Sequence, residues 1–248
     1  MNLEANNSKI LMVENIEKAY GGRKVVDSIS LFVKNKEIVG LLGPNGAGKT
    51  TTFYIILGLV EAEAGKIFID DIEITNMPMF KRARLGINYL PQESSIFRKL
   101  TVKENILAVL EVMNLTKKER EERLNSLLKL MGLMEVSNSK GYSLSGGERR
   151  RVEIARALAT HPKFMLLDEP FSEIDPIAIQ ELQKTIKLLA ERNIGVLITD
   201  HNVRDTLKIT DRAYIINNGR IFASGSPLEL SNNEDVKRIY LGKDFRLY

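Results

Sequence analysis

A glycine-rich octapeptide at residues 43–50 carries the clearest chemical signal in the sequence. It reads Gly-Pro-Asn-Gly-Ala-Gly-Lys-Thr and fits the phosphate-binding pattern G-x-x-x-x-G-K-[ST]. Glycines allow backbone N–H groups to converge on phosphate oxygens, and the start of a following helix favours negative charge. Lys49 adds a positive charge, and the Thr50 hydroxyl is expected to ligate Mg²⁺. The residues expected to bind a nucleotide here are Gly43, Pro44, Asn45, Gly46, Ala47, Gly48, Lys49, Thr50 and Thr51.

Two adjacent carboxylates, Asp168 and Glu169, follow the apolar run Phe164–Leu167. Such a run is typical of a buried strand, whose tip would direct both acids towards the phosphates. Asp168 is expected to hold Mg²⁺, directly or through water, and Glu169 to act as the general base on the attacking water. Many strands end in an acidic residue, so the pair alone is weak evidence for a nucleotide site. It becomes strong evidence in combination with the phosphate loop.

The pentapeptide Leu144-Ser145-Gly146-Gly147-Glu148 has two interpretations, and the sequence does not choose between them. Ser145 and Glu148 form the pattern of a capping box for a helix that runs to Leu158. Two glycines at a helix start also expose N–H groups, which can bind an anion.

The elements that must position these groups follow from short apolar runs bounded by Gly, Asn and Asp. A mixed start followed by strand–helix alternation predicts an α/β fold with an antiparallel flank. Strands are expected over residues 10–13, 29–33, 37–42, 65–69, 87–90, 164–167 and 195–198, with a hairpin of residues 212–216 and 220–223. Helices are expected over residues 48–59, 179–189 and 235–240, and residues 1–8 are expected to fray.

Residues 101–131 break the alternation and predict a helical insertion. Thr101 with Glu104, and Thr116 with Glu119, each fit a capping box. The apolar residues that follow recur at the spacing of one helical face.

Composition limits the classes of protein to consider. The chain has 248 residues, of which 44% are hydrophobic and 27% charged, with a formal net charge of +4. These fractions are typical of a globular protein, and the small basic excess does not indicate nucleic-acid binding. The absence of cysteine excludes a disulfide framework and a cysteine nucleophile. No run of about 18 apolar residues exists, so the chain is not expected to span a bilayer by itself.

In this order, the phosphate loop, the 144–148 motif and the Asp168–Glu169 pair resemble the ATPase subunit of an ABC transporter. The resemblance covers about residues 10–223. It implies a P-loop NTPase with a RecA-like core, an antiparallel β flank and an inserted α-helical subdomain. The whole chain, residues 1–248, would form one domain. The implied parts are a core at 9–92 and 160–225, a helical subdomain at 93–159, and a C-terminal helix and tail at 226–248.

The resemblance also implies roles for single residues outside the three motifs. Gln92 would contact Mg²⁺ or the attacking water, and His201 would bind the γ-phosphate and orient Glu169. Tyr20 would stack on adenine. Asp175 would lie at a contact between two subunits, although Glu173 departs from the small residues common near that position.

ATP and Mg²⁺ are the implied cofactors, and a second copy of the chain is the implied partner. In such a dimer each ATP lies between one phosphate loop and the partner's 144–148 motif. Ser145, Gly146, Gly147 and Glu148 would therefore act on the nucleotide of the other copy.

Within this family, residues 86–102 and 238–245 resemble the group that drives lipopolysaccharide export. That resemblance implies two polytopic inner-membrane partners and a place on the cytoplasmic face, with membrane association only through those partners. Phe97 and Arg98 are the expected contacts with them. The alternatives are a branched-chain amino-acid importer ATPase, a soluble ATPase of the same superfamily, and a P-loop kinase for a small metabolite.

Overall fold

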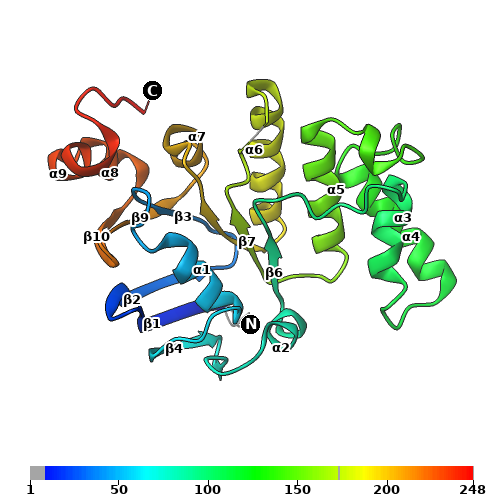
Figure 1. Ribbon diagram of the computed structural model, residues 1–248. Helices are drawn as coiled ribbons and strands as arrows, with labels where there is room; N and C mark the ends of the chain where they lie inside the picture. The colour runs from blue at the N-terminus through cyan, green and yellow to red at the C-terminus, as the bar shows by residue number, and fades with distance from the viewer. Residues whose placement is uncertain (1–8, 173, 248) are drawn as a thin grey trace, which may run out of the picture.

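The computed structural model describes residues 9–172 and 174–247, and these form two sheets surrounded by helices (Figure 1). The expected frayed tail at residues 1–8 and the departure at Glu173 lie outside the described residues. One sheet has four strands in the order β2-β1-β4-β5, and the other has six in the order β10-β9-β3-β8-β7-β6.

The four-stranded sheet is the predicted antiparallel flank. Its strands are β1 (Ile10–Tyr20), β2 (Arg23–Lys34), β4 (Ala64–Ile69) and β5 (Ile72–Glu73). All its pairings are antiparallel. β1 and β2 are much longer than predicted because irregularities in register, for example between Val13 and Ile16, let the pairing continue past the polar residues that interrupt the apolar alternation.

The six-stranded sheet positions the candidate chemistry. Its strands are β3 (Ile38–Leu42), β6 (Ile87–Leu90), β7 (Phe164–Asp168), β8 (Gly195–Thr199), β9 (Arg212–Asn217) and β10 (Arg220–Gly225). All are parallel except β10, which forms the predicted hairpin with β9. Every residue of β3, β7 and β8 is buried. Since the carboxyl ends of parallel strands meet at one edge, the segments after β3, β7 and β8 come together there.

Helices cover both faces of this sheet. α1 (Lys49–Leu57) packs in a hydrophobic cluster between the two sheets, together with residues of β1 and β3. α6 (Pro176–Glu191) packs against the other face. The remaining short helices of the core, α2 (Met79–Leu85) and α7 (Val203–Leu207), were not predicted.

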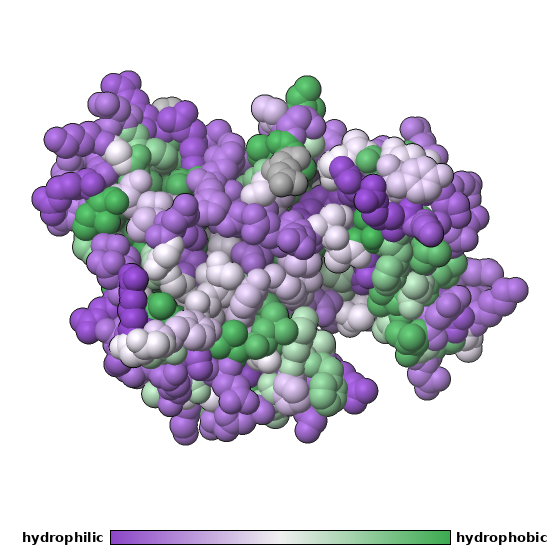
Figure 2. Space-filling model, viewed as in Figure 1, coloured by the Kyte–Doolittle hydropathy of each residue, from purple (hydrophilic) through white to green (hydrophobic). Residues whose placement is uncertain are grey.

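The helical insertion is present and lies to one side of the sheets (Figure 1). It contains α3 (Val102–Leu110), α4 (Lys117–Leu130), a 3₁₀ turn η1 (Gly141–Ser143) and α5 (Gly146–Leu158). Both predicted capping boxes of α3 and α4 are formed. Figure 2 shows hydrophobic residues gathered on this helical part, whereas polar residues cover most of the rest of the visible face.

The C-terminal segment differs from the single helix predicted at residues 235–240. It forms α8 (Pro227–Asn232), α9 (Glu234–Val236) and a π-helical turn, η2 (Lys237–Leu241). Asn233 begins α9 by accepting two backbone N–H bonds, and this cap divides the segment. No helix of residues 9–172 and 174–247 has the length and hydropathy needed to cross a membrane. The domain boundaries inferred above remain predictions.

Candidate nucleotide site

The phosphate loop connects β3 to α1, which is the strand–loop–helix arrangement that the motif requires. Two of its glycines are required by close approach of the backbone. A Cβ at Gly43 would lie 2.1 Å from the Ile216 carbonyl oxygen, and one at Gly48 would lie 2.3 Å from the Val25 carbonyl oxygen. The loop is therefore packed against β2 and β9, and it can present backbone N–H groups without side-chain obstruction.

Lys49, the first residue of α1, is buried at the base of the loop. Its Nζ donates to the carbonyl oxygens of Gly43, at 2.7 Å, and Pro44, at 3.1 Å. Burial lowers the pKa of Lys49, and the negative charges of Glu169 and Asp168 oppose that shift. The ammonium group therefore lies in the electrostatic field of both carboxylates and next to the phosphate loop.

Glu169 and His201 face the phosphate loop across a cavity of about 390 Å³. Its lining comprises Val25, Asn45, Gly46, Ala47, Gly48, Lys49, Thr50, Thr51, Glu169 and His201. His201 Nε2 lies 2.6 Å from Glu169 Oε1, and the Ser172 hydroxyl lies 3.2 Å from Glu169 Oε2. The structure thus brings together the predicted base, its predicted partner and the loop, which come from three separate parts of the chain.

Glu169 has a left-handed backbone with φ of 46°, which is uncommon for a residue other than glycine. Its N–H donates to the Thr199 carbonyl oxygen at 2.8 Å, so the chain turns away from the path of β7 directly after Asp168. Because of this turn the Glu169 carboxylate lines the cavity at the phosphate loop, whereas the Asp168 carboxylate does not.

Asp168 is buried at the tip of β7, where two hydroxyl groups orient its carboxylate. The Thr199 hydroxyl donates to Oδ1 at 2.8 Å, and the Tyr89 hydroxyl donates to Oδ2 at 3.2 Å. Burial, together with the charge of Asp168, raises the pKa of Tyr89, so the phenol keeps its proton. Asp168 is not among the residues that line the cavity at the loop.

The predicted magnesium ligands Thr50, Gln92 and Asp168 supply a hydroxyl, an amide oxygen and a carboxylate. These oxygen donors suit Mg²⁺, which is commonly held by one or two protein groups together with substrate phosphates. Among residues 9–172 and 174–247, no group of three or more His, Cys, Asp or Glu side chains is arranged to hold a metal ion by itself. The donor set therefore fits a metal that arrives with a nucleotide.

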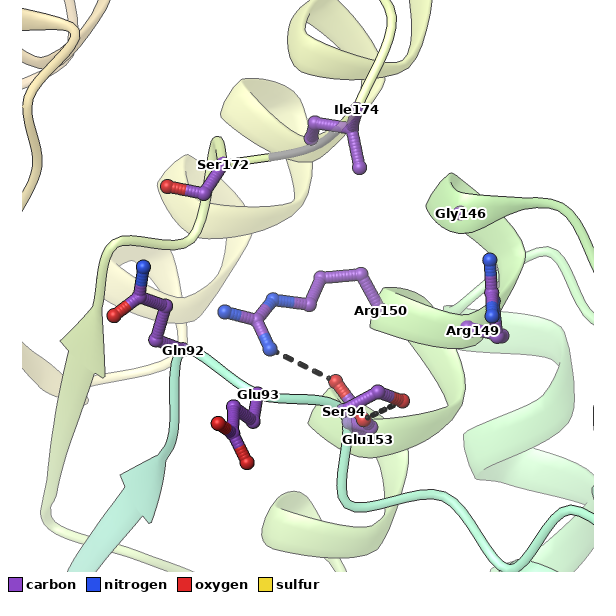
Figure 3. Close-up of a pocket in the computed structure, with 9 residues that line it drawn as sticks. All are labelled: Gln92, Glu93, Ser94, Gly146, Arg149, Arg150, Glu153, Ser172 and Ile174. Atoms are coloured by element: carbon purple, nitrogen blue, oxygen red, sulfur yellow. Dashed lines mark hydrogen bonds and ion pairs between the residues drawn. The ribbon is translucent and has the colours of Figure 1, made fainter.

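Gln92 follows β6 and lines a neighbouring cavity of about 360 Å³ rather than the one at the loop. Figure 3 shows Gln92 and Ser172 on one side of this cavity, with Gly146 and Arg149 of α5 on the other. Ser172, which contacts Glu169, connects the two cavities.

The 144–148 motif begins α5 and forms the predicted capping box. Ser145 Oγ accepts a bond from the Glu148 N–H at 3.2 Å, and the Glu148 carboxylate accepts bonds from the N–H and hydroxyl of Ser145. Gly147 has a packing reason of its own, because a Cβ there would lie 3.0 Å from Ala178 Cβ on α6. None of these residues lines the cavity at the phosphate loop of the same chain.

Comparison with known proteins decides the family. A family model described as ABC transporter matches residues 26–172, which is more than half of the chain. The chain belongs to the ATP-binding proteins of ABC transporters. The resemblance inferred from the three motifs is thereby confirmed, and this ABC ATPase is the nucleotide-binding, ATP-hydrolysing subunit of a transporter.

Individual relatives agree with this assignment. The chain is 56% identical to the lipopolysaccharide export system ATP-binding protein LptB of Haemophilus influenzae (strain ATCC 51907 / DSM 11121 / KW20 / Rd), over 96% of this chain and 99% of the relative. It is 28% identical to MJ1267, an ATP-binding cassette of an ABC transporter solved in its ADP conformation, with a TM-score of 0.85 over 95% and 99% of the two chains. A dimeric post-hydrolysis state of the cassette MJ0796, bound to ADP and Pi, gives a TM-score of 0.75 at 28% identity, over 88% and 98%. The predicted fold class is therefore confirmed.

Four further predicted residues lie at the surface of this ABC ATPase. Tyr20 is 51% exposed at the end of β1, so it is not a core residue, and it lies outside the lining of the cavity. Asp175 is exposed and caps α6 by accepting bonds from two backbone N–H groups. Phe97 and Arg98 are exposed on the loop before α3. Their predicted roles need a nucleotide or a partner and remain predictions.

Sequence reasoning missed several residues that shape the site. Tyr240 of η2 is half-buried against the Gly43 backbone and near Asp200, and loss of contact with water raises its pKa to about 12. Asp200 bridges the segments after β7 and β8 by accepting bonds from the N–H groups of Phe171 and Asn202. Motif spacing does not reveal these contacts. Tyr240 and Gly43, like Phe171 and Asp200, are distant in sequence, and the bond between Asp200 and Asn202 depends on a local turn.

Proposed function

We propose that two copies of this ABC ATPase bind and hydrolyse ATP to power the extraction and export of lipopolysaccharide from an inner membrane. The observation that carries the proposal is 56% identity to a lipopolysaccharide export system ATP-binding protein, over 96% of this chain and 99% of that protein. The agreement includes the C-terminal segment, which lies outside the family model.

In the proposed mechanism Glu169 is the general base that takes a proton from the attacking water. The 2.6 Å contact between His201 Nε2 and Glu169 Oε1 holds the carboxylate towards the phosphate loop, and His201 would also bind the γ-phosphate. Lys49 would exchange its bonds to the loop carbonyls for bonds to phosphate oxygens. Its burial makes that charge effective, because little water is available to screen it.

Thr50, Gln92 and Asp168 would hold Mg²⁺ together with the nucleotide. When bound, the ion would offset negative charge on the β- and γ-phosphates. Tyr89 and Thr199 keep the Asp168 carboxylate in a fixed orientation for that task. Tyr20 is proposed to stack on adenine from its exposed place at the end of β1.

The 144–148 motif is proposed to bind the nucleotide of the second copy. Its exposed Ser145 and its position outside the cavity of its own phosphate loop support this arrangement. Two ATP molecules would then hold a two-fold dimer together, with Asp175 near the contact, and hydrolysis would release it. To move a closed-to-open ratio from 1:99 to 99:1, nucleotide must favour the closed state by about 5.5 kcal/mol.

We propose two polytopic inner-membrane proteins as the further partners, with Phe97 and Arg98 among the contacts. The ATPase would thus be peripheral on the cytoplasmic face of that membrane. Exposure of an aromatic side chain next to a cationic one on a short loop supports a docking role for this surface.

Depletion of the protein from its native cells tests the proposal. Newly made lipopolysaccharide should remain in the inner membrane, while uptake of branched-chain amino acids should be unchanged. Wild-type protein supplied from a plasmid should restore export, whereas the Glu169→Gln variant should not. Normal lipopolysaccharide export together with lost amino-acid uptake would instead identify an importer ATPase.

A further inference from the structure

The segment at residues 91–97, which carries Gln92 and Phe97, is fastened by three charged side chains of α5. They are Arg150, Glu153 and Arg156, which we call the α5 ladder. Their spacing of three residues places them along one side of the helix. Figure 3 shows Arg150 and Glu153 beside the segment, within the cavity that Gln92 lines.

Glu153 is the middle member and is only 3% exposed. Its Oε1 accepts bonds from the Ser94 hydroxyl, at 2.7 Å, and from the Ser95 N–H, at 2.6 Å. Its Oε2 accepts a bond from Arg150 Nη1 at 3.0 Å. A buried carboxylate is costly unless it is paired and hydrogen-bonded, and these three contacts meet that condition.

The outer members extend these contacts in both directions. Arg150 Nη1 donates to the Pro91 carbonyl oxygen at 2.7 Å, and Arg150 Nη2 donates to the Asp168 carbonyl oxygen at 3.4 Å. Arg156 donates to the Ser95 carbonyl oxygen at 2.6 Å, and its guanidinium lies 4.4 Å from the centroid of the Phe97 ring. The ladder therefore joins α5, the tip of β7 and both ends of the segment.

Outside the ladder, the segment is held at its far end, where the buried Asn105 amide accepts a bond from the Phe97 N–H at 2.9 Å and donates to the Phe97 carbonyl oxygen at 3.1 Å. Residues 92–95 are all exposed, and Ile96 is the buried apolar side chain that follows them. The exposed Gln92 therefore lies between the paired end of β6 at Leu90 and the bonds that the ladder makes to Pro91, Ser94 and Ser95. Glu153 is central because it binds two consecutive residues of the segment and also orients Arg150.

We propose that Glu153 is a positioning residue for ATP hydrolysis, which keeps Gln92 at a fixed place relative to α5 and the tip of β7. This inference rests on the role of Gln92 in the proposed function. A glutamine at residue 153 would retain one acceptor oxygen for Ser94 and Ser95, but its amide group would face the Arg150 guanidinium. The charge of Glu153, and not only its size, is therefore required.

The test is a double-mutant cycle on the full-length protein. Glu153→Ala and Gln92→Ala are each expected to lower kcat by about tenfold or more, because small displacements of a reacting group are costly. The ATP affinity of Glu153→Ala should stay within about twofold of wild type, since Glu153 does not line the cavity at the phosphate loop. In the Gln92→Ala background, Glu153→Ala should lower kcat by less than about twofold further, because residues that act through one another are not additive.

Two controls separate positioning from a general structural effect. Glu181→Gln removes the ion pair between Arg151 and Glu181, which also involves α5 but does not touch residues 91–97, and should leave kcat unchanged. Glu153→Gln preserves the volume of the side chain and should show a smaller loss of kcat than Glu153→Ala, at a melting temperature close to wild type. If Glu153→Ala does not fold, Glu153→Gln takes its place in the double-mutant cycle.

The outcomes separate this inference from the proposed function. If Gln92→Ala alone is impaired and Glu153→Ala multiplies the loss by its full factor, Glu153 does not act through Gln92 and the inference is overturned. If Gln92→Ala alone retains wild-type kcat, the role of Gln92 in the proposed function fails, and the role of Glu153 fails with it.

Discussion

At the scale of single residues, the site depends on how two consecutive carboxylates are sent to different environments. Asp168 ends β7 and is held by two hydroxyl groups, whereas Glu169 turns through a left-handed backbone towards His201. The contact between His201 and Glu169 keeps the latter carboxylate facing the loop. The two acids can therefore take different tasks, metal binding for one and proton abstraction for the other.

Glu169→Gln tests the proposed base. Glutamine keeps the size of the side chain but cannot accept the proton, so phosphate release should fall by at least ~10²-fold. ATP binding should persist, because Lys49 and the loop backbone are unaltered, and the ATP-bound dimer should accumulate. Phosphate release and nucleotide binding by the same preparation measure both effects. Near wild-type turnover would place the base elsewhere.

At the scale of elements, α1 must be held firmly because it carries Lys49 and Thr50. Its last carbonyl groups are satisfied by Arg82 of α2, which is 2% exposed. The guanidinium donates to the carbonyl oxygens of Ile55 and Ile56 at 2.7 Å each, and also to those of Met77 and Thr75 at the same distance. Burial lowers the pKa of Arg82 to about 10, so it stays charged at neutral pH.

Arg82→Lys should destabilise the protein by about 2–4 kcal/mol. A lysine ammonium cannot match the planar arrangement of four acceptors, so buried carbonyl groups are left without donors. Denaturant unfolding followed by circular dichroism measures the free energy of unfolding. Arg84→Lys, an exposed position on the same helix, is the matched control and should have little effect. Equal losses in both variants would contradict the assigned role.

The elements that sequence predicted are those with strong local signals. β3, β7 and β8 follow continuous apolar runs, and three capping boxes lie where Thr101, Thr116 and Ser145 indicate them. The short helices α2 and α7 were missed because their stability comes from tertiary contacts, such as those of Arg82, and not from periodicity. The helix α8 was missed although Ser226 and Glu229 form a capping box and Pro227 begins the helix. Likewise, the motifs identified the loop and both acids, but the α5 ladder depends on packing between segments about 60 residues apart.

At the scale of the whole molecule, the two candidate contact surfaces are on different parts of the fold. The phosphate loop and the start of α5 would face a second copy, whereas the loop with Phe97 and Arg98 would face a membrane partner. The α5 ladder connects these surfaces, because Arg156 contacts the Phe97 ring and Arg150 reaches the Asp168 carbonyl. The ladder thus forms a continuous set of contacts between the two surfaces.

Arg98→Glu tests the proposed membrane-facing surface. Reversal of an exposed charge at an interface should reduce recovery of the polytopic partners by about tenfold, which corresponds to roughly 1.4 kcal/mol. ATP binding by the isolated protein should be unchanged. Copurification from detergent-solubilised membranes measures the first effect, and Lys118→Glu at an exposed site on α4 is the control. Undiminished recovery would remove Arg98 from the interface.

The backbone angle at Glu169 also affects how mutational libraries should be interpreted. Asn and Gly accept that angle easily, while Val, Ile and Thr resist it through their branched Cβ atoms. Inactive variants at residue 169 therefore fall into two groups. Some are folded and present at normal protein levels but do not hydrolyse ATP, and others are present at low levels because they misfold. A growth screen merges the groups, and protein abundance has to be scored beside it to tell them apart.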